Sequence, residues 1–174
     1  APGGGGGLRV LSLTLCATSP GGPEATPVAP DLLSLFDDWE DAAPASRHEM
    51  AAAFLQRGLP PSWASASPGR PRLLARAAKA FAEQTPRSAA TLAAQAAAVR
   101  TFDGGRRLGV MWKQDVARGG GGGEAVPRVM VLHGGADSAI APENSELLAQ
   151  YLGPVCELSL WPGSGHLLFF EEPQ

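Results

Sequence analysis

The sequence has little of the chemistry that indicates a nucleic-acid-binding, membrane-spanning or disulfide-stabilised protein. Its 174 residues include two cysteines, and the formal net charge is -3 at pH 7. So small a charge predicts neither a nucleic-acid surface nor a strongly acidic tail, and no electrostatic partner is implied. No apolar run is long enough for a transmembrane span, and any targeting peptide would lie upstream of the residues shown.

Large apolar side chains are also fewer than the composition suggests. Hydrophobic residues make up 44 % of the chain, but many of them are alanine. The 22 glycines and 16 prolines are many for a compact domain, although fewer than a wholly disordered chain would carry. We therefore expect one domain with a thin core and marginal stability.

The most informative stretch runs from Val129 to His166, where an acid and a histidine each follow an apolar strand pattern. Strand, helix and strand in succession imply a parallel pair, and ligand-facing groups lie beyond the carboxyl ends of such strands. Asp137 and His166 are therefore expected at one edge of the sheet. The expected elements are a strand at Val129–Leu132, a helix from Pro142 to a stop at Gly153, and a strand at Cys156–Trp161.

This order resembles the C-terminal part of an α/β-hydrolase. In that family the triad runs nucleophile, acid, histidine, with the acid in H/W-G-x-x-D after a strand and the histidine closing a G-x-G-H turn. Here these are HGGAD at residues 133–137 and GSGH at 163–166, and FFEEP at 169–173 is similar to the segment that follows the histidine. The fold class that the resemblance implies is α/β, namely the C-terminal part of an α/β-hydrolase parallel sheet with an inserted all-helical lid.

The resemblance also implies a role for each of these side chains. Asp137 would be the triad acid that orients the imidazole, and His166 would be the general base. The alternatives are a turn aspartate that caps the next helix and an ordinary loop histidine. His133 is expected to be structural, hydrogen-bonded beneath the site. The three could also converge on a metal, but the lack of a third, closely spaced histidine or a Cys pair disfavours a metal site.

The family's nucleophile elbow, G-x-S-x-G, occurs nowhere in these residues. Ser164 lies between glycines but has His166 where the elbow needs glycine, so we interpret it as a turn serine. Leu8–Gly22 resembles the sixth strand and following loop of the family, which come directly after the elbow helix, and the chain begins with Ala1. We therefore interpret the chain as the C-terminal portion of a longer hydrolase, inactive by itself.

The resemblance and the composition together predict four regions. Leu8–Cys16 is apolar on both faces, which predicts a buried strand. In the helical insert expected from Asp31 to about Arg107, the patterns predict a short helix from Leu32, a capping box at Ser46–Glu49 and a well-marked helix at Arg72–Gln84. A Thr85–Pro86 pair is expected to open a last helix that runs to about Arg100. The regions are a strand and loop at 1–30 with a disordered glycine tract, a mobile helical lid at 31–107, a flexible Gly-rich connection at 108–127, and the C-terminal strand-helix-strand at 128–174.

Two further groups of residues have open or structural interpretations. The aromatic residues of the insert either line a substrate pocket or form the insert's own core, and the core is favoured for Trp39, Phe54, Trp63 and Phe81. On the strand order that the resemblance implies, Cys16 and Cys156 fall on strands separated by the one at Val129, beyond disulfide reach, so we expect reduced thiols and favour an intracellular setting.

The function predicted from these observations is that of a serine-type hydrolase acting on a small ester or lactone. The partner is a small-molecule substrate, and no cofactor is predicted. Neither glycine tract is interpreted as a phosphate loop, because neither ends in a Lys-Ser/Thr pair. Two alternatives stay open, a dehalogenase or haloperoxidase of the same fold and a noncatalytic binding protein. The sequence does not determine the oligomeric state.

Overall fold

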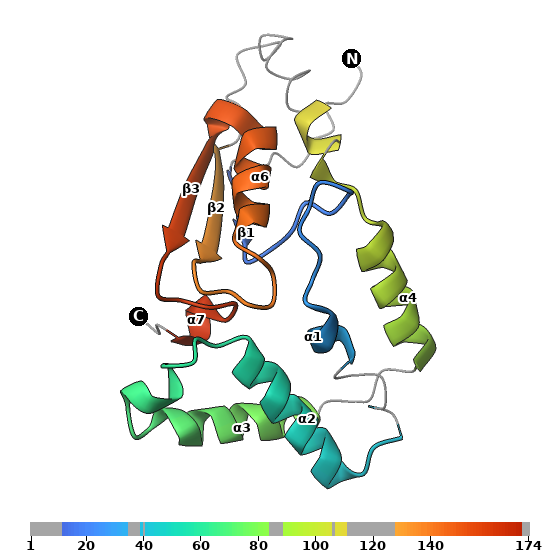
Figure 1. The fold of residues 1–174 in the computed structure, drawn as a ribbon, viewed down its shortest axis with the longest axis vertical. Helices are drawn as coiled ribbons and strands as arrows, with labels where there is room; N and C mark the ends of the chain where they lie inside the picture. The colour runs from blue at the N-terminus through green and yellow to red at the C-terminus, as the bar shows by residue number, and fades with distance from the viewer. Residues whose placement is uncertain are drawn as a thin grey trace, which may run out of the picture.

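The computed structural model describes residues 12–34, 39, 41–83, 89–105, 107–110 and 128–171. A parallel sheet lies at one end of the molecule, and helices α2 and α3 lie beyond the tips of its strands (Figure 1). The strands are β1 (Ser12–Cys16), β2 (Arg128–Gly134) and β3 (Cys156–Trp161). The α-helices include α1 (Pro30–Ser34), α2 (Pro44–Arg57), α3 (Arg70–Ala82), α4 (Ala89–Thr101), α6 (Glu143–Leu152) and α7 (Leu168–Glu171), and short 3-10 helices lie at Ala64–Ala66 and Gly153–Val155.

The sheet has the order β1-β2-β3, and both pairs are parallel. The predicted strand at Cys156–Trp161 is confirmed at both ends, and the strand predicted from Val129 extends from Arg128 to Gly134. Helix α6 connects β2 to β3 and ends at Gly153, whose φ of 65° favours a residue without a Cβ. The predicted parallel strand-helix-strand unit is therefore confirmed.

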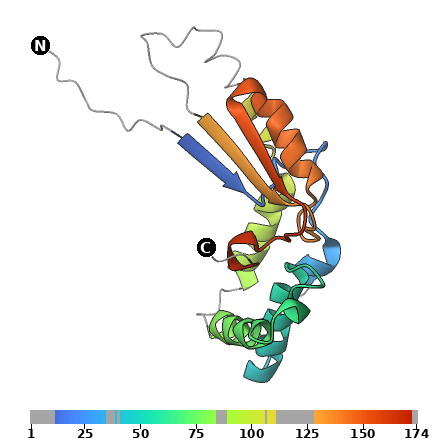
Figure 2. The same ribbon diagram turned by 90° about the vertical axis from the view of Figure 1, so that its left-hand side faces the viewer.

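One face of the sheet is covered by α6. Val129 and Val131 point to that face and pack against Leu148 and Leu152 of the helix, which forms the main core. The alternate residue of β2, Met130, is 37 % exposed. In the turned view, α6 lies along one side of the strands (Figure 2). Within the described residues, the sheet is therefore packed on one side and open on the other.

The strand β1 differs from its prediction. The apolar pattern predicted a strand buried on both faces, but Ser12, Leu13 and Thr14 are exposed, and Leu13 keeps 40 % of its surface. The physical reason is that β1 pairs only with β2 among the described strands, and a parallel strand is buried only where elements cover both of its faces. Residues 8–11 of the predicted strand lie outside the described part.

The residues just before α1 and those just after α4 lie side by side. Gly21 forms an antiparallel bridge with Asp103, and the N–H of Gly22 donates to the carbonyl of Phe102 at 2.8 Å. The φ angles of Gly21 and Gly22 are 64° and 80°, so the close approach relies on glycine. We call residues 23–101 the helical insert, and its α2 and α3 lie beyond the carboxyl ends of the strands (Figure 2).

The insert has a small core of its own. Trp39, Ala51 and Ala78 are buried together, and Phe81 packs against them. The Phe81 ring lies 5.8 Å from that of Trp39, edge to face, and 5.5 Å from that of Phe54, stacked. These three aromatic residues therefore form the core that the sequence favoured. Trp63 does not join it, because its ring packs in a tilted orientation against Phe170 of α7, with centroids 5.3 Å apart.

Three boundaries between β1 and β2 either differ from their predictions or lie outside the described residues. The predicted capping box at Ser46–Glu49 is wrong, because α2 begins at Pro44 and no side chain caps it; proline needs no N–H partner in a first turn and starts the helix earlier. The predicted Thr85–Pro86 start of α4 lies outside the described residues. Residues 107–110 are helical, which differs from the flexible connection predicted from residue 108. Residues 111–127 and the glycine tract at 3–7 lie outside the described residues.

The two cysteines lie on the outer strands of the sheet, on either side of β2. Both are free thiols. Burial raises the pKa of each, and the negative charge of Asp137 adds to the rise for Cys16. A raised pKa favours the protonated thiol, and free thiols agree with the reduced state predicted for both cysteines.

Candidate active site

Asp137 lies on a tight turn directly after β2. The turn is held against the loop that follows β3, because Gly135 N–H donates to the carbonyl of Trp161 at 2.8 Å and Ala136 N–H to that of Ser164 at 2.9 Å. Gly134 has no room for a side chain, since a Cβ there would lie 2.1 Å from the carbonyl oxygen of Gly165. The two turns therefore stack closely, and glycine at position 134 permits it.

The carboxylate of Asp137 is buried and accepts four hydrogen bonds. Oδ1 accepts from the backbone N–H groups of Ala139 and Ile140 at 2.8 and 2.9 Å. Oδ2 lies 3.0 Å from His133 Nε2 and 3.0 Å from His166 Nδ1. Burial alone would raise the pKa of Asp137, but these hydrogen bonds and the His166 charge hold it well below its usual range. The side chain is therefore an ionised acceptor that orients two imidazoles.

His166 lies at the end of the turn after β3, and its ring nitrogen Nδ1 contacts Asp137 Oδ2. Because a carboxylate only accepts, the hydrogen of the neutral ring is on Nδ1. The side chain is 25 % exposed, and Nε2 has no hydrogen-bond partner among the described residues. The ring is thus held in the tautomer that leaves the Nε2 lone pair open to a proton donor.

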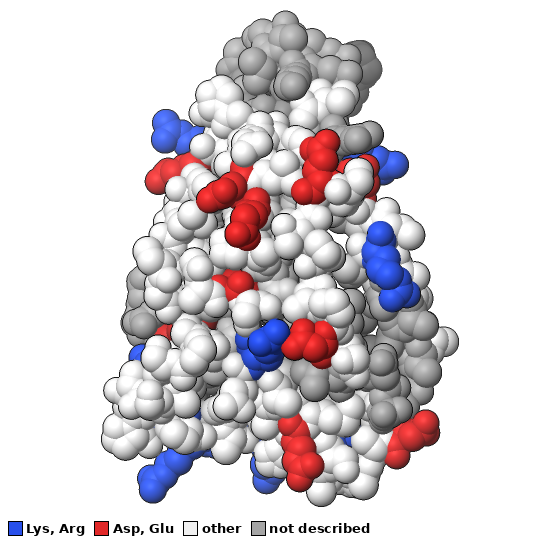
Figure 3. Space-filling view, in the orientation of Figure 1, with Lys and Arg blue, Asp and Glu red and all other residues white. Residues whose placement is uncertain are grey.

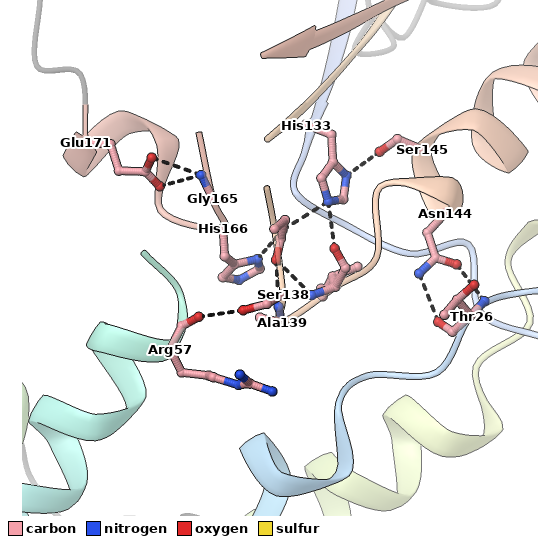
Figure 4. A network of polar contacts seen from close by, with 12 residues as sticks. Thr26, Arg57, His133, Ser138, Ala139, Asn144, Ser145, Gly165, His166 and Glu171 are labelled. Atoms are coloured by element: carbon pink, nitrogen blue, oxygen red, sulfur yellow. Dashed lines mark hydrogen bonds and ion pairs between the residues drawn. The ribbon is translucent and has the colours of Figure 1, made fainter. Parts of the chain in front are cut away.

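His133 lies on the other side of Asp137 and is fully buried. Its Nε2–H is shared between Asp137 Oδ2 and the carbonyl of Ile140, which is 2.9 Å away, and Nδ1 faces the hydroxyl of Ser145 (Figure 4). Burial lowers the pKa of His133, but the bonds to Asp137 and Ile140 and the charges of Asp137 and Glu143 raise it above its ordinary value. The structure places His133 beneath the pair, where the sequence analysis expected it.

The end of α2 contacts both turns of the site, and nothing in the sequence pattern indicated this contact. The carbonyl of Arg57 accepts from Ser138 Oγ at 2.9 Å. The carbonyl of Gly58 accepts from the backbone N–H of His166 at 2.7 Å and of Leu167 at 3.3 Å. Carbonyls at a helix C-terminus have no partner inside the helix, so they are available for such bonds. The helical insert is therefore joined directly to the turns of Asp137 and His166.

Glu171 also contacts the turn of His166, and no motif in the sequence assigned it a role. Its carboxylate is buried at 2 % exposure, and both oxygens lie 2.9 Å from the backbone N of Gly165. Trp63 of the insert donates its indole N–H to the Glu171 carbonyl at 3.4 Å. The similarity of the FFEEP segment to the family was the only signal that could have indicated this residue.

Away from Asp137 and His166, the described residues show few features of a second functional site. Among them, no group of three or more His, Cys, Asp or Glu side chains could hold a metal ion, and no helix is long and apolar enough to cross a membrane. On the face in Figure 3, Lys and Arg side chains lie apart from one another, and acidic side chains are most numerous over the sheet and α6. A cavity of about 330 Å³ lies where α2 begins and α3 ends, and its lining includes neither Asp137 nor His166.

The chain is similar in structure to several hydrolases. An esterase from Thermogutta terrifontis superposes with a TM-score of 0.62 at 20 % identity, with 95 % of this chain and 52 % of that chain covered. A hydrolase from Pseudomonas aeruginosa PA01 gives 0.62 at 27 % identity and the same coverages. MGS-M2, an alpha/beta hydrolase enzyme from a Medee basin deep-sea metagenome library, gives 0.58 at 14 % identity, with 93 % and 51 % covered. No family model and no curated protein matches the sequence.

These likenesses define the class of protein by its fold. The chain has the α/β-hydrolase fold, as the sequence resemblance predicted, and it spans about half the length of each of these hydrolases. The part it contains is the C-terminal portion of the parallel sheet, together with the helices that follow β1 and precede β2 along the chain.

Proposed function

We propose that this chain is the C-terminal portion of a serine-type α/β-hydrolase that cleaves a small ester or lactone. Asp137 is the triad acid and His166 the general base. The observation that carries the proposal is the 3.0 Å contact between Asp137 Oδ2 and His166 Nδ1, on a ring whose Nε2 faces no described partner. This is the acid–base half of a triad, in the chain order that the family uses.

The proposed chemistry follows from that geometry. His166 Nε2 accepts the proton of a serine hydroxyl as the oxygen attacks the ester carbonyl, and it later returns the proton to the leaving alcohol. Asp137 stabilises the imidazolium that forms between these steps, because its carboxylate stays ionised. The serine and the oxyanion-hole N–H groups come from residues outside these 174, since no G-x-S-x-G occurs among them. The helical insert then lies over the site as its lid.

The test uses the full-length protein, meaning the longest natural chain that contains these residues. We expect it to be labelled by a fluorophosphonate at one serine and to hydrolyse p-nitrophenyl acetate. His166→Ala should reduce both labelling and hydrolysis by at least about a thousandfold, because the base that activates the nucleophile is removed.

The matched control is His48→Ala, which removes an exposed histidine on α2 and should leave both rates within twofold of the parent protein. The proposal fails if the full-length protein is not labelled or if His166→Ala reacts as fast as His48→Ala. Release of halide from a haloalkane without fluorophosphonate labelling would instead indicate the dehalogenase alternative.

A further inference from the structure

The backbone of the histidine turn is held at three successive residues. The carbonyl of Ser164 accepts from Ala136 N–H at 2.9 Å, Gly165 N–H donates to Glu171, and His166 N–H donates to Gly58 at 2.7 Å. These partners come from three different segments: the Asp137 turn, α7 and the end of α2. With the backbone fixed on three sides, the position of the His166 ring depends on where these partners lie.

The segment that supplies Gly58 is itself well anchored. Gly58, Leu59, Pro60 and Trp63 are all buried, although they belong to the insert. Trp63 contacts α7 through its ring and its indole N–H, and the guanidinium of Arg70 lies 5.1 Å from the centroid of the same ring. The region from Gly58 to Trp63 is therefore a fixed support under the histidine turn.

We propose that Gly58 and Glu171 are positioning residues for His166. Gly58 holds the His166 backbone through its carbonyl, and Glu171 holds the preceding residue through its carboxylate. Together they set the distance from the imidazole to Asp137, and through Gly58 the insert controls the alignment of the base. This inference rests on the proposed function of His166, and it adds that the base is positioned by the insert.

Gly58→Ala tests the support without removing a hydrogen bond. The backbone at Gly58 has φ -77° and ψ -6°, which alanine adopts without strain. A Cβ there would lie 3.2 Å from Leu167 Cγ, so the Leu167 side chain must give by a few tenths of an ångström. The same Cβ would lie 3.6 Å from His166 Cβ, and we expect the histidine turn to shift together with Leu167. The matched control is Gly69→Ala in the same insert, where a Cβ meets nothing within 4 Å.

Two readouts on the full-length protein separate positioning from simple stability. In ¹H,¹⁵N NMR spectra, the Nδ1–H resonance of His166 should move upfield in Gly58→Ala and stay unchanged in Gly69→Ala, because its hydrogen bond to Asp137 lengthens only in the first. We also expect kcat to fall about tenfold in Gly58→Ala with KM within twofold, since small misplacements of a catalytic group act on turnover. The NMR readout needs no activity, so it is independent of the proposed function. The proposal fails if folded Gly58→Ala keeps the parent resonance.

A second pair of variants decides the case if Gly58→Ala does not fold. Glu171→Gln keeps the length of the side chain and one acceptor oxygen, so it can still bond Gly165 and should keep the His166 resonance. Glu171→Asp keeps the charge but is one methylene shorter, so it should shift the resonance. The proposal is refuted if the resonance is the same in both variants.

Discussion

Replacing Asp137 with asparagine exchanges one acceptor oxygen for a donor at the centre of the site. The new side chain keeps Oδ1, which still accepts from Ala139 and Ile140. In place of Oδ2 it presents an NH2 group to His133 Nε2–H and to His166 Nδ1–H. Two donors then face two donors, and each imidazole must move its hydrogen to the other nitrogen.

The two tautomer changes have different costs. In His166 the hydrogen moves to Nε2, the nitrogen that we propose accepts the nucleophile's proton, so turnover should fall by about 10⁴. In His133 the change leaves the Ile140 carbonyl without its donor, which costs about 1–3 kcal/mol at a buried site. The exchange of charged for neutral hydrogen bonds adds roughly 1 kcal/mol for each imidazole. The free energy of unfolding should therefore fall by about 3–5 kcal/mol.

The assays are ester hydrolysis and urea unfolding of the full-length protein. The matched control is Asp31→Asn on α1, whose carboxylate is 62 % exposed and pairs with Arg57 at 2.9 Å. A surface pair of this kind contributes about 0–1 kcal/mol, so the control should keep its turnover and most of its stability. Turnover of Asp137→Asn within tenfold of the parent would refute the triad role. Equal stability of Asp137→Asn and Asp31→Asn would refute the hydrogen-bond reasoning.

Two further predictions concern stability. Because the folded-state pKa of Asp137 is lowered, its carboxylate stabilises the protein above about pH 4, the unfolded value, and this contribution is lost as the pH falls below it. Unfolding free energies measured from pH 6 to pH 2.5 should therefore fall more steeply for the parent than for Asp137→Asn, and parallel curves would contradict this. Gly134→Ala should cost about 1–3 kcal/mol or more, because its Cβ would lie 2.1 Å from Gly165 O, whereas Gly163→Ala, whose Cβ meets nothing within 4 Å, should change stability by at most about 0.5 kcal/mol. Thermal unfolding compares the two, and equal melting temperatures would show that the turns are not packed as described.

The sequence by itself determined the strand-helix-strand unit and the meeting of Asp137 with His166. Apolar runs of strand length at Val129 and Cys156, with a helix between them that stops at a glycine, are local signals that require no knowledge of distant residues. Parallel strands place their carboxyl ends at one edge, so the approach of the acid to the base followed from topology. The structural place of His133 was implied by the family resemblance and not by these local patterns.

Only the tertiary structure decided what holds the pair in place. Gly58 lies 108 residues before His166, and no periodicity or turn signal links a helix C-terminus to a backbone N–H so far along the chain. The hydrogen bond that Gly165 N–H donates to the Glu171 carboxylate depends on how α7 folds back over the turn. The exposure of β1 likewise depends on which elements cover it, although its residues are apolar enough for a buried strand. Local patterns specify which elements form, whereas partners for buried polar groups are set by the packing of distant segments.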